Sequence, residues 1–308
     1  MQIKLGTATR SKGRMKKLPP HLRFALLFAI SLAIWWYPLV STFLLAAHDD
    51  EYTHIFLILP VSVALIFLEW RSLQPSSEPN VPVGSAMLLL ALLIGCFSRL
   101  EAHGLSPDLQ LSLSMAALVT WWIAAFVFCF GTRVSRLLVF PLCFLYWLVP
   151  IPEFVLSGMV SGLQRSSAWT AHALFTMSGV PVTQDGVLLS IPGVTIEVAK
   201  ECSSIRSTLM LVVTSMVLTH LFLRSIGRKI FVVLAAIPLS IARNGFRIFT
   251  LSMLGMHVDP GFLFGSLHQR GGILFFVLAL AVILLLLWLL RRTEDQPSQE
   301  TVLHPTRG

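Results

Sequence analysis

The chain has 308 residues, of which 55% are hydrophobic and 12% are charged, whereas soluble domains average about 45–50% and about 25%. The composition predicts a polytopic helical membrane protein and excludes disordered, collagen-like and disulfide-stapled scaffolds, because a soluble fold would need far more polar surface. The formal net charge of +8 is compatible with binding to nucleic acid and with contact to a membrane surface. The positions of the charges along the chain distinguish these two partners.

Eight apolar runs approach the length that crosses a bilayer, the second, third and fifth only with flanking residues or a thinned membrane. They are residues 22–45, 55–70, 83–97, 109–130, 137–149, 203–222, 230–254 and 272–290. A weaker stretch, 154–179, is interpreted as an amphipathic helix in the membrane interface, with a ninth span as the alternative. The predicted fold class is therefore an all-α polytopic membrane protein with eight transmembrane helices and an interfacial helix.

The distribution of basic residues orients the chain by the positive-inside rule. Residues 1–21 form a basic tail without an acidic residue, so this tail is predicted to be cytoplasmic. Both termini are then cytoplasmic, residues 22–292 form one transmembrane domain, and residues 293–308 form a polar, disordered tail. With eight crossings the cytoplasmic side also receives Arg71, Arg133, Arg136, Arg224, Arg228, Lys229, Arg291 and Arg292. The basic excess is a topology signal with anionic lipid as a secondary contact, and no nucleic-acid partner is expected.

Residues 181–200 are rich in β-branched side chains and contain the turn dipeptides Asp185-Gly186 and Pro192-Gly193. They predict a small β-hairpin or meander on the external side. This segment leads into Cys202 at the outer N-terminus of the sixth span, where unpaired amides and the helix dipole favour the thiolate. Ser203 and nearby amides are candidate donors to an oxyanion. An inert, buried thiol is the alternative interpretation, and it is the one adopted for Cys96, Cys129 and Cys143.

The seventh span carries Asn244 and Arg247, three residues apart on one helix face, and Arg247 lies near the expected depth of Cys202. An arginine there is costly unless it faces the bundle interior or an aqueous cavity, so Arg247 is a functional candidate. By contrast, Arg206 and Arg243 are expected to snorkel to the interface.

His268 precedes the last span, again on the outer side, and histidine is the side chain best suited to proton transfer near neutral pH. A cysteine, an arginine and a histidine at the outer ends of three consecutive spans predict a nucleophile site with charge stabilisation.

These residues carry a resemblance: the chain resembles the exosortase/archaeosortase family of membrane transpeptidases. The resemblance rests on residues 201–207 (Glu-Cys-Ser-Ser-Ile-Arg-Ser), on residues 244–248 (Asn-Gly-Phe-Arg-Ile) and on His268 with Gly271-Gly272. Tyr52-Thr53-His54 stands where the family tends to have a Tyr-x-His start, whereas Ser204 departs from the family's usual glycine.

The resemblance implies a protein-sorting reaction at the inner membrane, with the active site on the periplasmic side. Its substrates would be membrane-anchored proteins with a C-terminal signal, Pro-Glu-Pro followed by one transmembrane helix and a basic cluster, and the acceptor would be an exopolysaccharide or a lipid. Cys202 would be the nucleophile that forms an acyl-thioester, Arg247 a proton donor or charge clamp, and His268 the transition-state stabiliser. Asn244, His54, Ser203 and Arg206 would support them, and neither a cofactor nor a metal is implied.

Three alternatives stay open. Residues 48–54 (His-Asp-Asp-Glu-Tyr-Thr-His) contain metal-ligand types but lack the spacing of a zincin motif. A transporter or channel would use Arg247 and Asn244 to line a pathway, although no inverted repeat is visible. A non-catalytic partner in exopolysaccharide export is the third alternative.

Overall fold

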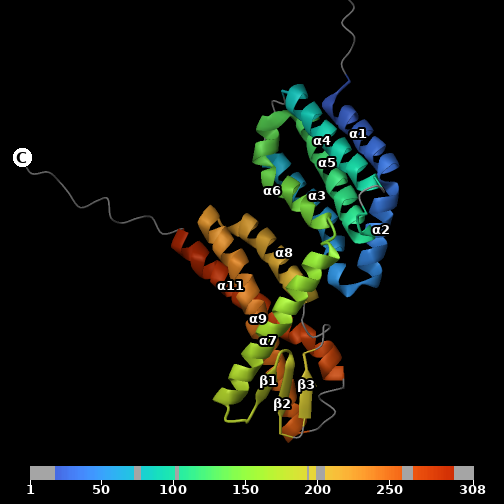
Figure 1. The fold of residues 1–308 in the computed structure, drawn as a ribbon. Helices are drawn as coiled ribbons and strands as arrows, with labels where there is room; N and C mark the ends of the chain where they lie inside the picture. Colours follow the sequence, from blue (N-terminus) through green and yellow to red (C-terminus); the bar gives the residue numbers. More distant parts are fainter. Residues whose placement is uncertain are drawn as a thin grey trace, which may run out of the picture.

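The computed structural model of the chain describes residues 18–72, 78–100, 104–192, 194–198, 205–258 and 266–294. These residues form a largely helical molecule with one small sheet (Figure 1). In chain order the elements are α1 (Pro20–Ile34), α2 (Trp36–His48), the 3-10 helix η1 (Asp50–Tyr52), α3 (Ile55–Ser72), α4 (Val81–Arg99), α5 (Pro107–Leu137), α6 (Val139–Phe144), the 3-10 helix η3 (Leu145–Leu148), α7 (Glu153–Met177), β1 (Thr183–Asp185), β2 (Leu188–Ile191), β3 (Val194–Glu197), α8 (Ile205–Phe222), α9 (Ile226–His257) and α11 (Ser266–Glu294).

Five helices in the described part are long and apolar enough to cross a membrane, and the number rises to seven if each of two bent pairs forms one span. The five are Asp50–Arg71, Val81–Arg99, Pro107–Leu137, Ile205–Phe222 and Gly272–Glu294. The bent pairs are α1 with α2 and Val139–Leu148 with α7, whereas α9, which contains the predicted seventh span, is not among the candidates. The architecture is that of a polytopic helical membrane protein, and the predicted count of eight spans is not confirmed.

The predicted first span is not one straight helix, because α1 and α2 meet at an angle of 72°. Pro38 lies in the first turn of α2 and has no N–H to donate to the carbonyl of Ile34, four residues earlier. The guanidinium of Arg99, in the last turn of α4, donates to that carbonyl instead at 2.7 Å. The bend therefore leaves the Ile34 carbonyl satisfied by a side chain from a neighbouring helix.

Helix α5 runs through the middle of an N-terminal bundle with α1 to α4 and α6 packed around it (Figure 1). Two of its indole groups donate to α1: Trp121 Nε1 to the Leu27 carbonyl at 3.0 Å and Trp122 Nε1 to Ser31 Oγ at 2.8 Å. Gly131 interrupts the helix with a φ of 83°. A Cβ there would come within 2.0 Å of the Glu78 carbonyl oxygen, so this close approach requires glycine.

Helix α7 leaves this bundle at a bend of 92° from Val139–Leu148. Its first N–H, from Glu153, donates to Asp108 Oδ2 at 2.9 Å, and the hydroxyl of Tyr52 donates to the Ile151 carbonyl at 2.9 Å. These bonds fix where α7 begins. The predicted helix over 154–179 is confirmed as an element, whereas its interfacial position stays a prediction.

Helices α8, α9 and α11 form a second group around a core that includes Leu211, Val232, Ala236 and Ile283. The start of α9 lies beside the end of α11, because Arg228 donates to the Leu290 carbonyl at 2.7 Å. Glu294 accepts the backbone N–H groups of Arg224 and Ser225, each at 3.0 Å. This carboxylate at the end of α11 therefore satisfies donors at the N-terminus of α9.

The predicted hairpin or meander at 181–200 is a three-stranded antiparallel meander in the order β1-β2-β3. Gly186, in the β1–β2 turn, has a φ of 60°, as the Asp-Gly dipeptide predicts. The inner face of the sheet buries Leu189, Ile191 and Val198 against α7 and α9, where they contact a cluster that includes Ala171, Phe175 and Ile248. The sheet thus fixes the second halves of α7 and α9 to each other.

The ends of α3, α5, α8 and α11 lie at the end of the molecule opposite the sheet (Figure 1), and their last turns carry Arg71, Arg136, His220, Arg291 and Arg292. Contacts support this: Glu69 near the end of α3 pairs with His220 near the end of α8, and Phe24 near the start of α1 lies 5.8 Å from Phe130 in the second half of α5. Arg99 at the end of α4 and Arg206 at the start of α8 lie toward the sheet instead. We call the end opposite the sheet the basic end, because the last turns of four helices bring basic residues together there. The sheet and the surrounding helix ends form the other end.

Candidate active site

The candidate site lies where the first turn of α8 meets α7, α9 and η1. Residues 199–204, which include Cys202 and Ser203, lie outside the described residues, but the chain on both sides of them is placed. The Val198 N–H donates to the Val187 carbonyl at 3.0 Å, and its own carbonyl accepts from Gln164 Nε2 of α7 at 2.9 Å. Ile205, at the start of α8, is 3% exposed. The segment with the predicted nucleophile is therefore bounded by two fixed points.

The first turn of α8 is joined to two other elements through its side chains. Arg206 forms an ion pair with Asp50 of η1 at 2.5 Å, and both side chains are exposed. Ser207 Oγ accepts a hydrogen bond from Arg243 Nη2 of α9 at 2.6 Å. An exposed pair such as Arg206–Asp50 contributes little free energy of folding, whereas a bond to a buried guanidinium is worth about 1.5–3 kcal/mol.

The expectation that Arg243 snorkels to the interface is wrong, because its side chain is only 7% exposed. The first half of α9 packs against α8 and α11, and the Arg243 side chain lies on the face of α9 that contacts α8. Because Arg243 bonds to Ser207, the buried charge holds α9 to the first turn of α8.

Asn244 and Arg247 lie in α9 as predicted, one residue and one turn beyond Arg243. Asn244 is 1% exposed, and neither its Oδ1 nor its Nδ2 has a hydrogen-bond partner within the described part of the chain. An amide that is buried without hydrogen-bond partners lowers the free energy of unfolding by about 1–3 kcal/mol. Such a group in a native protein therefore points to a functional role. Arg247 is partly buried. These two side chains provide hydrogen-bonding capacity and charge within one turn of Arg243, which contacts the first turn of α8.

Gly245 lets α9 approach α7 closely at this level. A Cβ at Gly245 would lie 2.5 Å from Thr170 Cβ and 3.2 Å from the backbone nitrogen of Ala171. The glycine of the 244–248 motif therefore has a packing reason that the sequence alone did not show.

His268 lies in the first turn of α11, whose backbone is described from Ser266 onward, but the His268 side chain is outside the described part. The Phe246 and Phe275 rings lie 6.1 Å apart and place α11 beside the motif region of α9. Seven residues separate His268 from Phe275, about two helical turns. That Cys202, Arg247 and His268 meet stays a prediction.

His54, a predicted supporting residue, is 2% exposed and lies edge-on to Trp147, with 6.1 Å between the ring centroids. The residues around it have structural partners: Asp49 Oδ1 accepts the Glu51 N–H at 3.0 Å, and His48 Nδ1 bonds the Leu44 carbonyl. Among residues whose positions are described, no group of three or more His, Cys, Asp or Glu is arranged to hold a metal ion.

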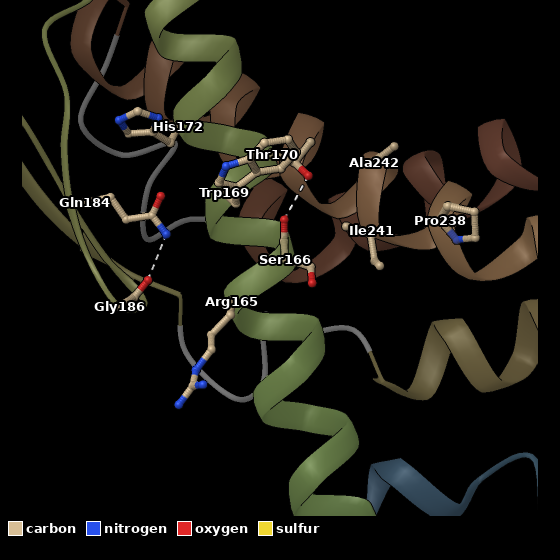
Figure 2. Close-up of a pocket in the computed structure, with 10 residues that line it drawn as sticks. All are labelled: Arg165, Ser166, Trp169, Thr170, His172, Gln184, Gly186, Pro238, Ile241 and Ala242. Atoms are coloured by element: carbon tan, nitrogen blue, oxygen red, sulfur yellow. Dashed lines mark hydrogen bonds between the residues drawn. The ribbon is translucent and has the colours of Figure 1, made fainter.

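A depression of about 960 Å³ extends across the outer surface of α7 (Figure 2). Figure 2 shows Arg165 and His172 on the side of the β1–β2 turn, and Ser166 and Thr170 on the side of α9. The sequence analysis described residues 154–179 only as a weaker apolar stretch and did not identify Arg165 or His172 as candidate site residues. Arg165, Trp169 and His172 follow an i, i+4, i+7 spacing, which places them on one helix face and was the available signal.

A family model described as transmembrane exosortase matches residues 45–285. The chain belongs to the transmembrane exosortase family. The match confirms the resemblance and includes the positions of Cys202, Arg247 and His268. Neither an individual curated protein nor a solved structure shows significant similarity to the chain. Exosortases are a family of transpeptidases and proteases, so the site between α8 and α9 is a candidate for peptide-bond chemistry.

Proposed function

We propose that this exosortase is a membrane cysteine peptidase and transpeptidase that processes membrane-anchored proteins carrying a C-terminal sorting signal of the Pro-Glu-Pro type. The observation that carries the proposal is the arrangement of α8 and α9. Helix α8, which follows Cys202 in the chain, is bound through Ser207 to Arg243 of α9. Arg247 lies one turn beyond Arg243 in α9. The family match over both segments supports peptide-bond cleavage.

In the proposed reaction the Cys202 thiolate attacks the carbonyl carbon of the scissile peptide, and the developing oxyanion is stabilised by the Arg247 guanidinium. The C–N bond then breaks, and the leaving amine takes a proton from the His268 imidazolium. An acyl-thioester on Cys202 remains. An acceptor amine or hydroxyl attacks this thioester, gives its proton to His268, and releases the thiolate.

Arg247 is proposed as a charge clamp and not as a proton donor, because a guanidinium stays protonated throughout the pH range of proteins. Preorganised donors of this kind typically contribute about 10²–10³ in rate. Asn244 is proposed to bond the substrate backbone, since its amide has one acceptor and two donor hydrogens that find no partner elsewhere in the described residues.

The proposed location is the inner membrane, with both termini in the cytoplasm and the sheet and active site on the periplasmic side. The gathering of basic helix ends at the end opposite the sheet supports this orientation. A substrate with one transmembrane helix and a basic cytoplasmic tail would then present its sorting motif at the level of α8's first turn. The proposed acceptor is an exopolysaccharide or a lipid.

The test is co-expression with a tagged substrate that ends in the sorting signal. Cys202→Ala and Cys202→Ser are expected to leave the substrate at full length while the enzyme stays in the membrane fraction. Cys96→Ala in α4 and Cys143→Ala in α6, which change exposed free cysteines outside α8 and α9, are expected to process normally. Mass spectrometry of the processed substrate locates the cut and reveals any attached acceptor. Normal processing by Cys202→Ala would refute the proposal.

A further inference from the structure

The depression on α7 joins a polar part and an apolar part. Arg165 and Trp169 lie on its α7 side, and Trp169 is 69% exposed. Its α9 side consists of Pro238, Ile241 and Ala242. A ligand that fills the depression would therefore contact a cation and an aromatic ring at one end and an apolar helix surface at the other.

The apolar side continues beyond the depression along α9. Ile230, Leu234 and Ile237 are 54%, 58% and 42% exposed, and they lie on the helix face that also bears Ile241. Large apolar side chains exposed in a row on a membrane protein are covered by acyl chains. The depression thus opens onto a surface that lipid tails cover.

The depression lies at the level where a membrane span ends. The bond from Arg243 to Ser207 sets the neighbouring Ala242 at the level of the first turn of α8, and α8 is one of the candidate spans. Tryptophan and arginine are typical of this level, because their apolar parts enter the membrane while their polar ends stay with the lipid headgroups.

The charge at this place is positive and available. Arg165 is exposed, and no described carboxylate forms a salt bridge with it. The described residues that line the depression include no acidic side chain. Asp185, in the adjacent β1–β2 turn, is not one of the lining residues. His172 adds a second group that can carry positive charge. An anionic group is therefore the complementary partner.

An anionic peptide fits the depression less well than a lipid. An extended peptide needs partners for its backbone N–H and C=O groups, but Thr170 Oγ1 already donates to the Ser166 carbonyl at 2.8 Å and Gln184 Nε2 to the Gly186 carbonyl at 2.9 Å. A phosphate headgroup needs only charge and a few donors, and its acyl chain needs none.

We propose that this depression is a binding site for an anionic phospholipid in the leaflet on the sheet side, with the phosphate at Arg165, the headgroup region against Trp169, and an acyl chain along the α9 surface at Ile241. The proposal concerns a surface of the fold and does not depend on the proposed reaction.

Trp169 makes the site measurable, because bromine on a lipid acyl chain quenches the fluorescence of a nearby indole. The full-length protein is reconstituted with brominated phosphatidylglycerol or brominated phosphatidylcholine, and subtracting the signal of Trp169→Phe isolates the Trp169 component. Phosphatidylglycerol is expected to quench this component at about fivefold lower mole fraction, the effect of one cation near an anionic lipid. Arg165→Gln should abolish the preference, Arg165→Lys should keep most of it, and Arg136→Gln at the basic end should leave it unchanged.

Four results would overturn the proposal. Equal quenching by both lipids, or a preference that survives Arg165→Gln, would show that Arg165 binds no headgroup. Displacement of the brominated lipid by inorganic phosphate would assign the site to a free anion. Displacement by a soluble acidic peptide would assign it to a peptide. Arg165 is exposed, so its variants should keep the wild-type thermal unfolding temperature, which verifies that they fold.

Discussion

At the scale of single residues, the three basic side chains near the start of α8 have different roles that sequence spacing alone does not separate. Arg206 is exposed and pairs with Asp50. Arg243 is buried and bonds Ser207. Arg247 lies one turn beyond Arg243 and is partly buried. Burial thus distinguishes a peripheral ion pair, a tie between helices and the proposed charge clamp.

Arg247→Lys tests the charge clamp. Lysine keeps the charge but loses the planar fork of donors, so the rate of substrate processing is expected to fall by about 10²-fold, the scale of one oxyanion donor. Pulse-labelling of the co-expressed substrate measures this rate. Arg71→Lys, a matched change at the basic end, is expected to process at the wild-type rate. Equal rates for the two variants would remove Arg247 from the reaction.

The sequence identified Asn244 and Arg247 as candidates because polar groups are rare in membrane helices. It failed for Arg243 because the buried side of α9 changes along the helix: the first half packs on α8 and α11, and the second half packs on α7 and the sheet. A periodic pattern with one fixed face cannot represent a helix that changes partners, so only the fold shows which arginine is buried.

At the scale of elements, the crossing of α7 and α9 positions the site. Gly245 permits the crossing, because any Cβ there would overlap Thr170. The same two helices hold Val198 through Gln164 and Ser207 through Arg243. The spacing between α7 and α9 therefore sets the positions of both ends of the segment that carries Cys202.

Gly245→Ala is expected to lower both thermal stability and substrate processing, because α9 must move away from α7. Overpacking of this kind typically costs about 1–3 kcal/mol. The second change Thr170→Gly removes the overlapping Cβ and should restore part of both properties. Gly158→Ala and Gly162→Ala on α7, where a Cβ meets open space, serve as controls and should not destabilise. Thermal unfolding in detergent gives the comparison, and a stable, active Gly245→Ala would contradict the packing argument.

The small sheet was the most predictable element, since β-branched residues and the Asp185-Gly186 turn define it locally. The bends were not predictable from hydropathy. The break between α1 and α2 involves Arg99 from another helix, and the bend before α7 involves Asp108 and Tyr52. The length of the apolar run at residues 22–45 therefore predicted one long first span, whereas the fold has two helices there.

At the scale of the whole molecule, the basic helix ends and the sheet lie at opposite ends. Positive-inside orientation then predicts that residues 1–17 face the cytoplasm and that the β1–β2 turn at Gly186 faces the periplasm. A fluorescent protein fused at the N-terminus should therefore be bright, and an alkaline phosphatase inserted at Gly186 should be active. The reverse pair of results, or both reporters on one side, would contradict the orientation.

The central claim is that Cys202 carries the substrate as an acyl-thioester, and capture with hydroxylamine tests it most directly. Hydroxylamine attacks a thioester and leaves a hydroxamate on the acyl group. Membranes with the wild-type enzyme and a tagged substrate should yield substrate that ends in a hydroxamate at the cleavage position, and Cys202→Ala membranes should yield only full-length substrate. Cleaved substrate without hydroxamate from the wild type, or any hydroxamate from Cys202→Ala, would contradict the claim.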